Sequence, residues 1–136
     1  MGPAMARAAF DTIYTYFSLS GKSPRDFDQI VTGDLGRVGS AVLSELLDKE
    51  VSGAASRHID CGNLIYSSKK DCHAGGSGCG CSASVLAAHF LPLLEKGIFK
   101  NILFLSTGAL MSPTSVMQGA NILGVAPAIH LSSDEL

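Results

Sequence analysis

The stretch Asn101–Thr107 (Asn-Ile-Leu-Phe-Leu-Ser-Thr) decides the fold class of this chain of 136 residues. An unbroken apolar run of this length is typical of a strand that is covered on both faces. Gln29–Thr32 predicts a second short buried strand, and Gly124–Ser132 predicts a last one. Each of these strands needs helices to cover it.

Three segments with helical periodicity supply that cover. Apolar positions recur at helical spacing over Met5–Leu19, from Leu35 to about Lys49, and over Ser82–Lys96. We expect Asp34 to act as the N-cap of the second helix and Pro92 to kink the third. Helices that alternate with short buried strands predict a layered α/β fold.

The remaining segments give weaker signals. We expect loops over Val51–His58 and Gly108–Gly124, a short strand over Asn63–Tyr66, and a polar turn over Ser67–Asp71. Only two strands are strongly indicated, and a two-stranded sheet with three helices leaves edges and apolar faces uncovered. The sequence therefore predicts an incomplete unit, or one completed by a partner.

Composition excludes several classes of partner and location. Hydrophobic residues make up 46% and charged residues 16%, below the quarter usual in soluble domains. The net charge of −2 provides no basic surface for nucleic acid. No apolar run reaches the roughly 18 residues of a membrane span. Crowded cysteines do not form a typical disulfide framework, so we expect reduced thiols in an intracellular protein.

The segment Cys72–Ser82 (Cys-His-Ala-Gly-Gly-Ser-Gly-Cys-Gly-Cys-Ser) is the densest in chemistry. It could form a metal site, a thiol site or a glycine-built pocket wall. Cys79 and Cys81 are too close for the usual zinc spacing, and no second ligand pair follows, so buried, inert thiols are favoured. The segment also lacks the Gly-Lys-Ser/Thr end of a phosphate loop, which favours close helix-to-sheet packing as the reason for its glycines.

Two further segments lie where α/β folds place their ligands. Thr32–Gly36 follows the strand over Gln29–Thr32, and Gly108–Pro113 follows the strand over Asn101–Thr107. Asp34 is either a ligand-binding carboxylate or a helix cap, and the cap is favoured.

Taken together, these segments resemble the stage V sporulation protein AD family of spore-forming bacteria. The resemblance rests on ordered motifs along nearly the whole chain: Met1-Gly2, Ala4–Ala6, Ile30–Gly36, Asp60–Gly62, His73–Ser82 and Ser106–Pro113. It implies a thiolase-like fold of two related α/β halves, each with a five-stranded sheet. Residues 1–136 would be the C-terminal half-domain, without its first strands and without the N-terminal half, so Met1 would match an internal methionine. A complete protein is expected to be a homodimer.

The resemblance also implies a function. The family is implicated in uptake of dipicolinic acid, as its calcium chelate, into the spore and in its release at germination. It works with other proteins of the same operon, peripherally at the spore inner membrane. Condensing enzymes of this fold use a His and a His or Asn, which are absent at the matching positions, Gly33-Asp34 and the glycine segment. No catalytic residue is therefore assigned. A residual acyltransferase half and a scaffold for membrane partners remain alternatives.

The loops that match the crevice of this fold supply the candidate ligand-binding residues. These are Gly33, Asp34, Gly75, Gly76, Ser77, Gly78, Cys79 and Gly108. Backbone N–H groups of glycine-rich turns suit the carboxylates of dipicolinate, and Asp34 would meet its bound calcium. No metal site of the protein's own and no other cofactor is expected.

Overall fold

The computed structural model describes residues 2–66, 72–75, 78–110, 112–121 and 123–135. The expected turn over 67–71 and the candidate residues Gly76 and Ser77 lie outside these ranges. Along the chain the helices are α1 (Gly2–Ser20), α2 (Gly36–Glu50), α3 (Cys61–Leu64), α4 (Cys81–Val85), α5 (Leu91–Glu95) and α6 (Pro113–Met117). The strands are β1 (Gln29–Thr32), β2 (His58–Asp60), β3 (Asn101–Leu105), β4 (Gly108–Leu110), β5 (Leu123–Val125) and β6 (Ala128–Ser132). Short 3₁₀ turns occupy Pro24–Asp26, Ala55–Arg57 and Ser133–Glu135.

The main sheet has four strands in the order β2-β1-β3-β6. β1 runs parallel to both β2 and β3, and β6 is antiparallel to β3. Thr32 pairs with Asp60 on one side and with Leu105 on the other. The carboxyl ends of the three parallel strands are therefore level, and the loops that follow them meet at one edge.

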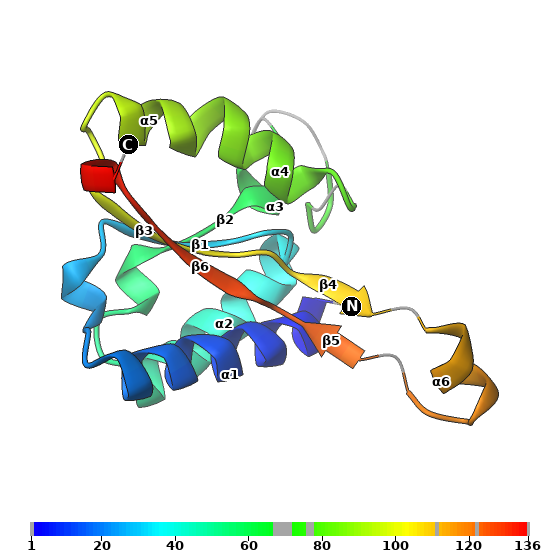
Figure 1. Cartoon of the computed structure of the whole chain (residues 1–136). Coiled ribbons are helices and arrows are strands. Elements are labelled where there is room, and N and C mark those ends of the chain that lie inside the picture. Colours follow the sequence, from blue (N-terminus) through cyan, green and yellow to red (C-terminus); the bar gives the residue numbers. More distant parts are fainter. Residues whose placement is uncertain (1, 67–71, 76–77, 111, 122, 136) are drawn as a thin grey trace.

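Helices cover both faces of this sheet, as expected for an α/β fold (Figure 1). α1 and α2 lie on one face, where the apolar cluster includes Ile13, Leu43 and Leu103. α3, α4 and α5 lie on the other face, where the cluster includes Phe90 and Phe104. The two clusters use alternate residues of the same central strands, because successive strand side chains point to opposite faces.

The three long helices and the central strands confirm the sequence predictions, with one refinement. The third helix runs unbroken from α4 through a π-helical turn, Leu86–Phe90, into α5. Pro92 sits in the first turn of α5. The widened turn just before it accommodates a residue that has no N–H to donate. Gly97 then ends the helix at φ +67°.

Three sequence predictions were wrong. Asn63–Tyr66 is not a strand: α3 and a bend occupy it, and the strand lies earlier at His58–Asp60, beginning at the last residue of the expected loop. Gly108–Gly124 is not an open loop, because it contains β4, α6 and the start of β5. Gly124–Ser132 is two strands rather than one, interrupted at residues 126–127.

β4 and β5 pair with each other as a separate antiparallel ribbon that carries α6 at its tip. We call residues 108–125 the arm, and it projects away from the layered body (Figure 1). Its base is held against α1: a Cβ added at Gly124 would lie 2.5 Å from Met5 Cε. The arm therefore has a fixed origin on the body.

Candidate functional site

Asp60 is the centre of the hydrogen-bond network at the carboxyl edge of the parallel strands. It is buried, and its Oδ1 accepts hydrogen bonds from the Thr32 hydroxyl (2.8 Å) and from the Leu35 N–H (2.8 Å). Its Oδ2 accepts from the Gly36 N–H at 3.0 Å. A carboxylate from β2 thus satisfies the first N–H groups of α2, which need partners at a helix start. The prediction that Asp34 caps α2 was wrong: the N-cap residue is Leu35, and Asp60 performs the capping from another strand.

His58, at the start of the same outer strand β2, also joins this network. Its Nε2 lies 2.8 Å from Thr32 Oγ1. Thr32 has one hydroxyl proton and donates it to Asp60, so His58 must be the donor, with its proton on Nε2. Burial lowers the pKa of His58 to about 4, which keeps the imidazole neutral at neutral pH.

Two opposing influences act on the Asp60 carboxyl. Burial is the largest, and it raises the pKa above its ordinary value. The donors on Leu35, Thr32 and Gly36 act against burial, while the nearby charge of Asp34 adds to it. The site therefore holds two acidic groups close enough to repel each other.

Asp34 links the strand edge to the glycine-cysteine segment. Its N–H donates to Thr107 Oγ1 at 2.9 Å, and its Oδ2 accepts from the Gly78 N–H at 2.9 Å. Gly62 lies between the Asp34 and Asp60 carboxylates and has no side chain to crowd them. An added Cβ would collide with Asp34 Oδ1 and lie 3.0 Å from Asp60 Oδ2. The two carboxylates thus flank a position where any residue larger than glycine would clash.

The glycine-cysteine segment is tied to α2 through its backbone. The Arg37 N–H donates to Ala74 O at 2.6 Å, and a Cβ on Gly36 would lie 2.7 Å from that same oxygen. Gly75 and Gly78 have φ of +74° and +88°, and Gly78 and Gly80 have open space where a Cβ would sit. Close helix-to-sheet packing was therefore the wrong explanation for Gly78 and Gly80. Left-handed backbone is the requirement at Gly75 and Gly78.

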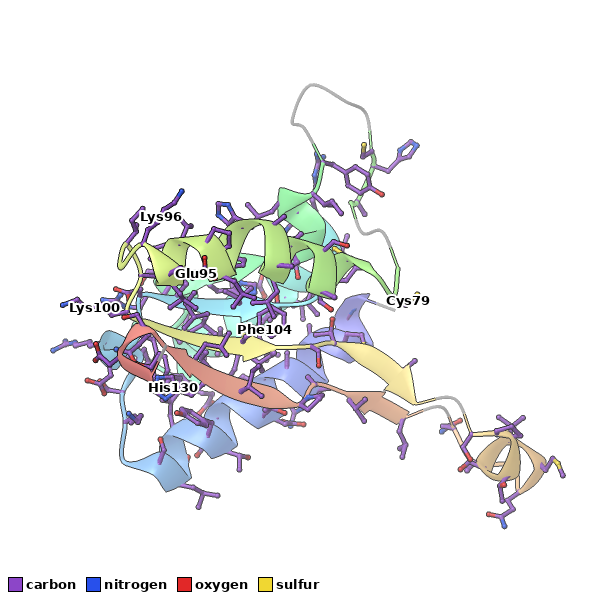
Figure 2. All side chains as sticks on the ribbon, turned by 45° about the horizontal axis from the view of Figure 1, so that its top comes forward. Cys79, Glu95, Lys96, Lys100, Phe104 and His130 are labelled. Carbon is purple, nitrogen blue, oxygen red and sulfur yellow. The ribbon has the colours of Figure 1, made fainter. Side chains whose placement is uncertain are left out.

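The four cysteines differ in burial, and Cys72 is half-buried. Cys61 and Cys81 are both buried, and burial raises the pKa of Cys61 to about 12. An unionised thiol is a poor nucleophile, so Cys61 fits an inert packing role. Cys79 is exposed and lies ahead of α4 (Figure 2), so the prediction of a buried thiol was wrong for this residue. Within the described ranges, no three His, Cys, Asp or Glu side chains are grouped to hold a metal ion.

The structure brings together most of the described candidate residues, but not all of them. Gly33 and Asp34 lie beside Thr107, Gly75 lies beside Gly62, and Gly78 is bonded to Asp34. A Cβ at Gly33 would lie 2.9 Å from Thr107 N, so no side chain fits there. Gly108 begins the arm and has open space around it.

Sequence reasoning missed Thr32, His58, Asp60 and Thr107 as parts of the network. Their position in the chain could have identified them, because three of these residues lie in parallel strands. His58–Asp60 was hidden because its strand has three residues and a single large apolar side chain.

Two comparisons with known proteins agree with the motifs. The family model of stage V sporulation protein AD matches residues 1–132. Stage V sporulation protein AD of Bacillus subtilis (strain 168) is 40% identical over 129 residues, which cover 95% of this chain and 38% of that protein. The chain thus spans well under half the length of this relative. It belongs to the stage V sporulation protein AD family.

Proposed function

We propose that this chain forms part of a binding site for the calcium chelate of dipicolinic acid in a non-catalytic, thiolase-like protein. The protein would support uptake of dipicolinic acid into the spore and its release at germination. Membership of the family supports a role in spore formation.

The observation that carries the proposal is the convergence of Asp34 with the glycine-cysteine segment. Asp34 Oδ2 and the Gly78 N–H meet 2.9 Å apart, at the carboxyl edge of the parallel strands. Open α/β sheets bind their ligands at this edge. The Gly78 N–H is taken by Asp34, so the backbone N–H groups of the exposed residues Cys79 and Gly80, ahead of α4, would receive a carboxylate. The Asp34 carboxylate suits a cation.

The local charges favour the chelate over bare dipicolinate. Asp34 and Asp60 lie at the same edge, so a bare dianion would be repelled. The N–H groups of Leu35 and Gly36 already bond to Asp60, which leaves the turn before α4 to receive the anion. Calcium carried by the ligand would offset this repulsion. The described side chains offer no cage for a calcium ion alone, so the ion would arrive as part of the cargo.

The wider setting belongs to the same proposal. No helix among the described residues is both long and apolar enough to cross a bilayer. We place the protein peripherally at the spore inner membrane, in contact with other proteins of its operon. The complete protein would be a homodimer without a nucleic-acid partner.

Isothermal titration calorimetry on the full-length protein that contains this chain tests the proposal. Calcium dipicolinate, dipicolinate alone and calcium alone are titrated into the wild type and into Asp34→Asn. We expect the wild type to prefer the chelate. Removing the charge should weaken chelate binding at least about tenfold, a change of about 1.4 kcal/mol. It should leave bare dipicolinate unchanged or bound more tightly.

Asp11→Asn is the matched control. Asp11 is exposed on α1, where its carboxylate pairs with Arg7 at 3.1 Å, away from the strand edge. It should bind like the wild type. Absence of heat with either form of dipicolinate in the wild-type protein would overturn the proposal.

A further inference from the structure

Arg37 is a cation at a position where a helix disfavours one. It is the second residue of α2, and its side chain is exposed. The N-terminus of a helix carries a partial positive charge, so acidic side chains are favoured in the first turn and basic ones are not. The first turn of α2 contains no acidic residue. Arg37 therefore makes the start of α2 less stable than a neutral polar side chain would.

No carboxylate of the described residues offsets this unfavourable charge. Among these residues the only ion pair joins Arg7 to Asp11 on α1. Asp34 lies three residues ahead of Arg37, but its Oδ2 accepts from the Gly78 N–H. A charge that lowers local stability without a compensating contact is typical of a functional site.

The backbone of Arg37 lies directly beside the candidate site. Its N–H donates to Ala74 O at 2.6 Å, in the first half of the glycine-cysteine segment. Asp34 contacts the same segment farther along, at Gly78. Arg37 and Asp34 therefore adjoin one segment at two places, and they carry opposite charges.

Arg37 is also the only Lys or Arg among the described residues of this edge. These residues are the segments after the three parallel strands, 33–40, 61–66 and 106–110, and the described parts of the glycine-cysteine segment, 72–75 and 78–82. Lys96 and Lys100 lie at the opposite end of the molecule from Cys79 (Figure 2). Of the described Lys and Arg side chains, Arg37 is thus the one placed to attract an anion to this edge.

We infer that Arg37 is a ligand-binding residue whose guanidinium holds one carboxylate of dipicolinate while Asp34 meets the calcium ion. The inference rests on the proposed function and deepens it by assigning the contact of opposite charge. A guanidinium presents parallel N–H donors that match the two oxygens of a carboxylate. The second carboxylate of the ligand would go to the N–H groups of Cys79 and Gly80.

Isothermal titration calorimetry on the full-length protein that contains this chain tests the inference. Dipicolinate is titrated with and without calcium into the wild type, Arg37→Gln and Arg37→Lys. Arg37→Gln should weaken binding at least about tenfold in both forms, because the carboxylate is present in both. Asp34→Asn should weaken the chelate alone. Arg37→Lys should give an intermediate affinity, because lysine keeps the charge but lacks the planar pair of donors.

Arg25→Gln is the matched control, since it removes the same charge from the other edge of the sheet. Arg25 is exposed on the turn Pro24–Asp26, ahead of the amino end of β1. Its replacement should leave the affinity for both forms of dipicolinate at the wild-type value. A general effect of net charge on binding would instead weaken Arg25→Gln as much as Arg37→Gln.

Thermal unfolding of the ligand-free variants separates ligand binding from a structural role. Removing a cation from the first turn of α2 should leave the midpoint of Arg37→Gln at the wild-type value or raise it. A lowered midpoint with wild-type affinity would assign Arg37 to an ion pair with the rest of the full-length protein and overturn the inference.

The titrations also distinguish this inference from the proposed function. Wild-type heat with unchanged affinity in Arg37→Gln would overturn the inference and leave the proposed function standing. A loss in Arg37→Gln confined to the calcium chelate would overturn it as well, because the carboxylates do not depend on calcium. Absence of heat in the wild type would overturn the proposed function and this inference together.

Discussion

Thr32 shows how a single hydroxyl organises the strand edge. It is fully buried at the carboxyl end of β1, where a valine would fill similar space. Its oxygen accepts from His58 and its proton goes to Asp60, so neither polar group is buried without a partner. Asp60 in turn holds the start of α2. Because a buried polar group without a partner costs about 1–3 kcal/mol, the three residues depend on one another.

This dependence predicts how stability varies with pH. The ordinary pKa of histidine is 6.5, and burial lowers that of His58 to about 4. Between these values the unfolded chain binds a proton at His58 that the folded chain does not. The free energy of unfolding should therefore fall as pH is lowered through this window, by up to about 1.4 kcal/mol per pH unit.

His58→Gln isolates this contribution, because glutamine can still donate to Thr32 but does not titrate. Urea unfolding at several pH values should give a shallower loss of stability for the variant than for the wild type. The raised pKa of Asp60 has the opposite effect on stability. It lowers the free energy of unfolding as pH rises above 3.8, the ordinary pKa of an aspartate. That contribution is common to both proteins and cancels in the difference. Parallel pH profiles would contradict the role of His58.

At the scale of elements, the contact between α1 and α2 depends on two glycines. A Cβ on Gly39 would lie 2.9 Å from Gly2 O and 3.0 Å from Leu35 Cβ. Alanine normally favours a helix over glycine by about 1 kcal/mol. Here we expect Gly39→Ala to destabilise the chain by about 1–3 kcal/mol, because backbone cannot move aside as a flexible side chain does. Chemical denaturation measures the change.

Gly80→Ala provides the comparison for this prediction. Gly80 precedes α4 with φ −85°, and an added Cβ would meet nothing within 4 Å. Its replacement should change the free energy of unfolding by no more than about 0.5 kcal/mol. A stabilised Gly39→Ala protein would show that the helices can separate slightly without loss.

Elements with long periodic patterns could be predicted from sequence, and short ones could not. The bounds of β1 were predicted in full, and those of α1 and α2 were nearly so, because burial of one face imposes a pattern on many residues. β2 has three residues and was placed wrongly, since so short a strand carries no periodicity. Most of the arm was predicted to be a loop, because its small and polar residues are also typical of turns.

The candidate site was predictable in position but not in partners. Strand ends in an α/β fold identify Gly33 and Asp34 from sequence, and the resemblance adds the glycine-cysteine segment. The role of Asp60 depends on β2 lying beside β1 in a register that pairs Asp60 with Thr32. That register is a long-range property, so a sequence without its fold could not reveal that Asp60 replaces Asp34 as the cap.

At the scale of the whole molecule, the two central strands join both helical layers into one unit. Ile30 and Leu103 face the cluster under α1 and α2, while Val31 and Ile102 face the cluster under α4 and α5. Removing either layer would expose apolar side chains of β1 and β3. The body should therefore unfold cooperatively, and the arm, with its exposed α6, lies outside this unit.

Shortening the arm tests that division. Gly108 and Val125 are cross-strand partners, so replacing residues 109–124 with Asn-Gly leaves a two-residue turn of the type that suits a hairpin. Closing a shorter loop gains about 0.6 kcal/mol for each halving of its length, and this gain opposes the lost contact of Gly124 with Met5. We therefore expect thermal unfolding, followed by circular dichroism, to remain cooperative with a midpoint near that of the wild type. A shortened chain that unfolds gradually would mean that the arm contributes to the core.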